Sequence, residues 1–81
     1  MSRILLSIEE LNHLIREEMR KHTECARVPM RSVYRQERDS TGCNWDVSMG
    51  ESDPADMAAC RERIIATIRE LRKQYNIVEE S

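Results

Sequence analysis

One histidine and all three cysteines form the group of residues with the chemistry to bind a metal ion. His22 and Cys25 are three positions apart, so on a helix their side chains would share a face. Cys43 and Cys60 fall on other predicted elements, and both belong to apolar patterns. Zinc binds three thiolates and one imidazole in a tetrahedron, but the chain has no Cys-x-x-Cys pair. We therefore expect no bound metal and keep these four residues as the candidate ligands.

The same residues allow three other interpretations. Cys25 and Cys60 could form a disulfide, because both lie on apolar faces near the ends of predicted helices. His22 and Cys25 could form a nucleophilic pair, although the two glycines of the chain provide no Gly-rich loop for an oxyanion site. Each thiol could instead be a small buried apolar group, since free cysteine is among the most buried residue types. We expect this last role, and hence no catalysis and no cofactor.

The composition describes one small domain, residues 1–81. The chain has a net charge of −2, 35% charged residues typical of a solvated surface, and no phenylalanine. A chain this short buries roughly 60% of its unfolded surface, so a partner subunit would help to complete its core. Three cysteines do not suggest a secreted disulfide framework, and the apolar run at 4–6 is too short for a leader or a membrane span. We expect a cytoplasmic protein with reduced thiols.

Two segments have the periodicity of amphipathic helices. The sequence Ser-Ile-Glu-Glu is a capping box, and the apolar residues that follow at helical spacing predict a helix over 7–26. Asp53 has the features of an N-cap residue, with Pro54 in the first turn, which predicts a second helix over 54–75. The tail at 79–81, which contains two glutamates, is expected to fray.

The segment between the helices alternates between apolar and polar residues, which predicts an antiparallel hairpin. Its strands are expected over 28–38 and 43–49, and placing both apolar sets on one face pairs Tyr34 with Val47. Two helices packed on that face would make a two-layer αββα domain of the α+β class. Because the edges of a hairpin need protection, we also expect a homodimer, in which two hairpins could join into one four-stranded sheet.

Four features are distributed along the chain: Cys25 near the end of the first helix, the Gly-Cys-Asn-Trp start of the second strand, Cys60 early in the second helix, and its Leu-Arg-Lys-Gln-Tyr-Asn-Ile end. In these features, which span most of its length, the chain resembles a group of short bacterial proteins of uncharacterised function. The resemblance implies no activity, cofactor or partner.

The distribution of charged residues bears on whether the chain binds proteins or nucleic acids. Arginines follow the first strand and the second helix, at positions 27, 31, 35, 38, 61, 63, 69 and 72. Guanidinium groups suit phosphate, but acidic residues lie among them, and segment 39–60 has five acidic and no basic residues. We predict a protein-binding or regulatory domain without catalysis, acting through self-association or contact with an unknown protein partner. Weak nucleic-acid binding through the arginines is the alternative, and no membrane contact is expected.

Overall fold

The computed structural model describes residues 3–78. In chain order its elements are β1 (Ile4–Leu6), α1 (Ile8–Arg20), the 3₁₀ turn η1 (Thr23–Cys25), β2 (Met30–Arg35), β3 (Trp45–Met49), α2 (Pro54–Gln74) and β4 (Tyr75–Ile77). β2 pairs with β3 antiparallel, and β1 pairs with β4 parallel. The predicted α+β class is confirmed. The prediction of a single hairpin is wrong, because residues on either side of the two helices form a second strand pair.

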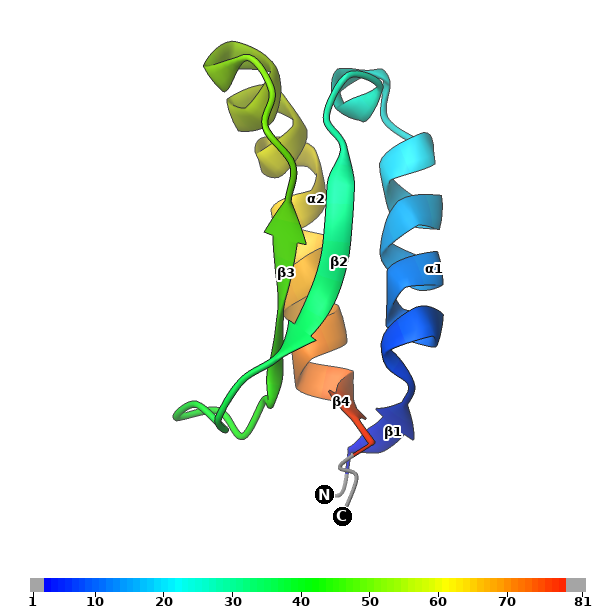
Figure 1. Cartoon of the computed structure of the whole chain (residues 1–81), viewed down its shortest axis with the longest axis vertical. Coiled ribbons are helices and arrows are strands. Elements are labelled where there is room, and N and C mark those ends of the chain that lie inside the picture. Colours follow the sequence, from blue (N-terminus) through cyan, green and yellow to red (C-terminus); the bar gives the residue numbers. More distant parts are fainter. Residues whose placement is uncertain (1–2, 79–81) are drawn as a thin grey trace.

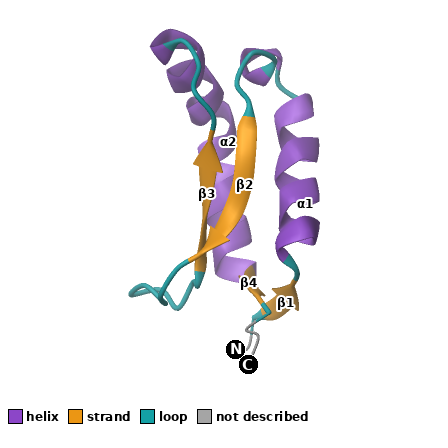
Figure 2. Ribbon diagram, viewed as in Figure 1, coloured by secondary structure: helices purple, strands orange, loops and turns teal. Residues whose placement is uncertain are grey.

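The helices and the hairpin run along the long axis of a molecule that measures 38 × 22 × 21 Å (Figure 1). α1 lies beside β2, and α2 passes behind the hairpin (Figure 2). β1 and β4 lie at one end, whereas η1 and the start of α2 lie at the other. The core lies between the hairpin and both helices and is formed by buried residues from all three: Leu11, Ile15, Met19, Val33, Trp45, Ile64 and Ile68.

Both helices begin where their capping residues predict. The Glu10 N–H donates to Ser7 Oγ at 3.1 Å, and the Ser7 N–H donates to Glu10 Oε1 at 3.1 Å, which completes the capping box. Asp53 Oδ1 accepts from the Ala55 N–H at 2.8 Å, so Asp53 is the N-cap of α2. These contacts span only a few residues, and local sequence is therefore enough to predict them.

The end of α1 differs from the prediction. The helix stops at Arg20, because His22 takes an extended conformation with φ −121° and ψ 120°. The chain then turns through η1, which sends Cys25 into the core and against α2. Cys25 is buried in the same core as the apolar face of α1 although it lies in a 3₁₀ turn. The apolar pattern of the sequence therefore continues beyond the helix, and this pattern alone predicts a helix end that is too late.

The hairpin is also shorter than predicted, and its register differs by one residue. Val33 pairs with Val47 and Tyr34 with Asp46, after an irregularity between Met30 and Ser32. A bulge reverses which residues face inward, and accordingly Val33 is 2% exposed while Tyr34 is 46% exposed. Strict alternation along the first strand cannot reveal such a change of phase.

Side chains link the hairpin to the β1–β4 pair. Asn44 Nδ2 donates to the Ile77 carbonyl at 3.0 Å, and the Ile77 N–H donates to Asn44 Oδ1 at 2.9 Å. Trp45 Nε1 donates to the Tyr75 carbonyl at 2.9 Å. The Asn44 amide thus makes the two hydrogen bonds that a residue of a neighbouring strand would make.

Cys25 and Cys60 form a disulfide that joins η1 to α2, with their Cα atoms 4.6 Å apart. Cys43 is a free, buried thiol. The prediction of reduced thiols is therefore wrong for Cys25 and Cys60. Because disulfides are typical of oxidising compartments, this bond lends no support to the predicted cytoplasmic location. The predicted frayed segment 79–81 lies outside the described residues.

We predict that the Cys25→Ser/Cys60→Ser variant loses about 3–4 kcal/mol of unfolding free energy, the loop-closure contribution for residues 35 positions apart. Urea denaturation followed by fluorescence of the buried Trp45 measures this loss. Wild-type protein in excess dithiothreitol should unfold at the variant's midpoint. Thiol titration of the unfolded, unreduced protein should detect Cys43 alone, and detection of all three cysteines would contradict the disulfide.

We also predict that Asn44→Ala lowers the unfolding free energy by about 2–6 kcal/mol. The substitution leaves the buried N–H and carbonyl of Ile77 without partners, at about 1–3 kcal/mol each. Ser40→Ala, an exposed change in the same loop, is the control and should stay within about 0.5 kcal/mol of wild type. Equal urea midpoints for Asn44→Ala and Ser40→Ala would show that Asn44 does not stabilise the contact between the hairpin and the β1–β4 pair.

Candidate functional site

The four candidate metal ligands do not meet. Cys25 and Cys60 are bonded to each other, Cys43 lies near Arg72, and His22 contacts Glu18. Within residues 3–78, no group of three or more histidine, cysteine or acidic side chains could hold a metal ion. The helix spacing that placed His22 and Cys25 on one face does not apply, because α1 ends before both residues.

His22 makes a local contact with the end of α1. One of its ring nitrogens, Nε2, lies 3.1 Å from Glu18 Oε2, and this hydrogen bond is the main cause of a lowered pKa at Glu18. In the structure Cys25 carries no thiol to pair with the imidazole, since its sulfur is bonded to Cys60. The geometry therefore does not assemble the nucleophilic pair that was one alternative interpretation of these residues.

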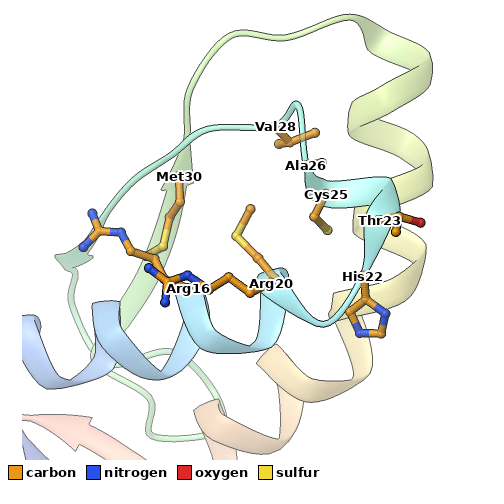
Figure 3. Close-up of a pocket in the computed structure, with 9 residues that line it drawn as sticks. Arg16, Arg20, His22, Thr23, Cys25, Ala26, Val28 and Met30 are labelled. Carbon is orange, nitrogen blue, oxygen red and sulfur yellow. The ribbon is translucent and has the colours of Figure 1, made fainter.

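A first hollow of about 480 Å³ lies between the end of α1, η1 and the start of β2. Met19, Val28 and Met30 supply its apolar lining, and Arg16 and Arg20 lie at one side (Figure 3). The His22 ring and the Cys25 sulfur extend from the turn in different directions (Figure 3). This hollow presents apolar surface beside the disulfide but no convergent set of reactive groups.

A larger groove of about 720 Å³ lies between β3 and α2, and we call it the β3–α2 groove. Its apolar lining includes side chains from both elements, of which Val47, Met49, Met57 and Ile65 are only partly buried. Ala58 lies exposed in the same lining. The groove is thus an apolar surface that residues 3–78 leave partly uncovered.

Charged side chains complete this groove. The lining holds Arg61, Arg69, Arg72 and one carboxylate, Asp46. Arg61 and Arg69 are exposed, and within residues 3–78 no ion pair joins either to an acidic side chain. Sequence analysis noted both arginines as basic positions of the second helix, but it could not show that they border an apolar groove. That relation depends on how α2 packs against β3.

Asp39, Arg72 and Cys43 meet where the hairpin loop contacts the end of α2. Asp39 Oδ2 lies 2.7 Å from Arg72 Nη2, and Arg72 Nε donates to Cys43 Sγ at 3.5 Å. The bond to Cys43 is the main cause of a raised pKa at Arg72, with the nearby carboxylates of Asp46 and Asp39 contributing. The pKa of Asp39 is lowered, chiefly by the hydroxyl of Thr41, which donates to it at 2.6 Å. This cluster fixes the loop to α2 and leaves Cys43 without exposed surface.

Both strands of the hairpin have an N–H that is bonded to a side chain. The Val33 N–H donates to Asn12 Oδ1 of α1 at 2.7 Å, and the Val47 N–H donates to Asp46 Oδ1 at 2.8 Å. These two donors are therefore not available to a strand from another chain. Blocked donors of this kind are one way in which proteins protect sheet edges.

Acidic residues interrupt the predicted basic surface. Arg63 Nε donates to Glu24 Oε2 at 2.7 Å, and this contact, after a hydrogen bond from the Glu24 backbone, contributes to a lowered pKa at Glu24. Lys73 and Glu70 also pair on α2. Arg35 Nη2 donates to the Val78 carbonyl at 2.9 Å. The arginines of the second helix and first strand therefore do not act as one set of unpaired cations.

Comparison with protein-family models, curated proteins and solved structures gives no match for this chain. The resemblance to short bacterial proteins stays an expectation. In addition, none of the helices within residues 3–78 has the length and apolar character needed to cross a membrane. Functional inference here depends on the geometry of the chain itself.

The lowered pKa of Asp39 predicts a pH dependence. A carboxyl whose pKa is lower in the folded state stabilises the fold above its unfolded pKa, about 3.9, and loses that contribution as the pH falls through the folded value. We expect Asp39→Asn to be less stable than wild type at neutral pH and equally stable once the pH is well below the ordinary range of an aspartate. Urea midpoints across this range measure the difference. Glu37→Gln, an exposed change nearby, is the control, and a constant difference at all pH values would contradict the assignment.

Proposed function

We propose that the protein is a small protein-binding domain without catalysis and that the β3–α2 groove is its binding surface. The observation that carries this proposal is the combination, in one groove, of partly exposed apolar side chains with two arginines that no acidic side chain of residues 3–78 pairs. Protein interfaces typically have an apolar centre and a polar rim, with arginine and methionine enriched. The groove has that composition.

The chemistry of the thiols supports a non-catalytic role. Cys25 and Cys60 are bonded to each other, and Cys43 is fully buried beside Arg72. A nucleophile needs access to substrate, a nearby base and donors that stabilise developing charge. None of the three sulfurs has this combination within the described part of the chain.

The groove favours a different protein over a second copy. Two copies related by a two-fold axis present the same patch to each other, so Arg61 and Arg69 of both copies would enter one interface. Like charges placed opposite one another are unfavourable. The hairpin edges offer little for the alternative four-stranded sheet, because Asn12 and Asp46 already accept from the Val33 and Val47 N–H groups. We therefore propose contact with a partner, with self-association as the alternative outcome.

Nucleic-acid binding is the second candidate that the arginines suggest. It would need a continuous basic surface with stacking aromatic groups. Ion pairs of Arg63 with Glu24 and of Arg72 with Asp39 reduce the free positive charge on α2, and Tyr34 is the one aromatic residue among the large exposed side chains of residues 3–78. These contacts make protein binding the better supported function.

Photo-crosslinking from two alanines of α2 tests the proposal. Ala58 lines the groove, whereas Ala66 is exposed outside its lining. We expect benzoylphenylalanine at position 58, in the native cell, to crosslink a discrete protein and the same probe at position 66 to give none. Mass spectrometry identifies the crosslinked chain.

The outcomes separate the alternatives. A crosslink from position 58 to a second copy of this chain would show self-association instead of contact with a different protein. A crosslink to RNA or DNA would favour nucleic-acid binding. Equal crosslinking from positions 58 and 66, or none from either, would contradict a binding role for the groove.

A further inference from the structure

We infer that the β3–α2 groove recognises an acidic apolar segment of a partner protein, in which two carboxylates flank an apolar side chain. This inference rests on the proposed function and names the partner's chemistry. It follows from three features of the groove: two arginines without an acidic partner within residues 3–78, their spacing along α2, and the adaptable apolar lining beside them.

The arginines establish the sign of the partner's charge. Arg61 and Arg69 have no acidic partner within residues 3–78, and the groove's own carboxylate, Asp46, is directed to the Val47 N–H. Arg72 is held by Asp39 at 2.7 Å. The groove thus has two guanidinium groups free to bind, and guanidinium groups pair with carboxylates through two parallel hydrogen bonds.

The spacing of the arginines predicts the spacing of the acidic and apolar residues in the partner segment. Arg61, Ile65 and Arg69 are four positions apart in turn, so they share a face of α2. At 1.5 Å per residue, Arg61 and Arg69 lie about 12 Å apart along the helix axis, with Ile65 midway. In an extended peptide that distance corresponds to about four residues. The pattern Glu-x-Leu-x-Glu therefore matches the stripe, since these three side chains also share one face of an extended chain.

The apolar lining suits such a segment. Met49 and Met57 lie on opposite sides of the groove, on the end of β3 and in the first turns of α2, and both are only partly buried. Methionine side chains are flexible and adapt to differently shaped apolar partners. Because the Val47 N–H is already bonded to Asp46, the groove would recognise side chains rather than extend the sheet.

Binding of short synthetic peptides to the intact protein tests this inference. The probes are a capped peptide with the core Glu-Ser-Leu-Ser-Glu, a Lys-Ser-Leu-Ser-Lys version and a Glu-Ser-Ser-Ser-Glu version. We expect only the first to give saturable amide chemical-shift changes, at groove residues such as Val47, Ala58 and Ile65. Affinity should fall as salt is added, because exposed charges take part.

Charge-reversal variants of the protein, with a matched control, form the second part of this experiment. Arg61→Glu/Arg69→Glu should weaken the acidic peptide by about tenfold or more, the loss expected when charges across an interface become repulsive, and should allow the lysine peptide to bind. Arg20→Glu/Lys73→Glu makes the same change in net charge at exposed positions outside the groove and should leave affinity unchanged. Ala58→Trp should block the peptide, whereas Ala66→Trp should not.

The outcomes distinguish this inference from the proposed function. Equal or tighter binding of the lysine peptide, shifts confined to the first hollow, or no binding of the acidic peptide would overturn the acidic assignment. If position 58 still crosslinks a specific protein in that case, the binding role stands and only the partner's chemistry is wrong. Displacement of the acidic peptide by single-stranded RNA, with RNA producing the same shifts more strongly, would overturn the inference in favour of nucleic acid.

Discussion

The paired hydrogen bonds between the Asn44 side chain and the Ile77 backbone are the contact on which the arrangement of this protein depends. Asn44 directly precedes β3, and Ile77 ends β4, which follows α2 without a break. This contact therefore holds the hairpin against the end of α2, and the Trp45 indole adds a further bond to the same strand. A small core has little apolar area to determine such an orientation, so directional hydrogen bonds to buried backbone groups supply it.

The Cys25–Cys60 disulfide performs the corresponding task near the other end. It joins η1 to the second turn of α2, and these segments lie at the opposite end of the molecule from β4 (Figure 1). α2 is thus tied to the rest of the fold near both of its ends, and the lining of the β3–α2 groove extends along α2 from Pro54 to Arg72. A groove whose walls are held in this way loses little conformational entropy when a partner binds, which favours affinity.

Two polar side chains protect the strands of the hairpin. Asn12 accepts from the Val33 N–H, and Asp46 accepts from the Val47 N–H. In both cases a side chain occupies a donor that a foreign strand could use. The β3–α2 groove differs from these edges, because Arg61 and Arg69 border partly exposed apolar side chains there and have no acidic partner within residues 3–78. Because these two backbone donors are already bonded, recognition at the groove would depend on side chains.

The sequence by itself determined the features that depend on neighbouring residues: the caps of both helices and the burial of Cys43 and Cys60 within apolar patterns. Each results from contacts within a few positions, which local pattern can reveal. Only the tertiary structure decided the end of α1, the strand register, the β1–β4 pair, the disulfide and the groove. These features join residues tens of positions apart, and their energies depend on how whole elements pack. The candidate metal set shows the difference, because the four residues have suitable chemistry but packing places them in separate parts of the molecule.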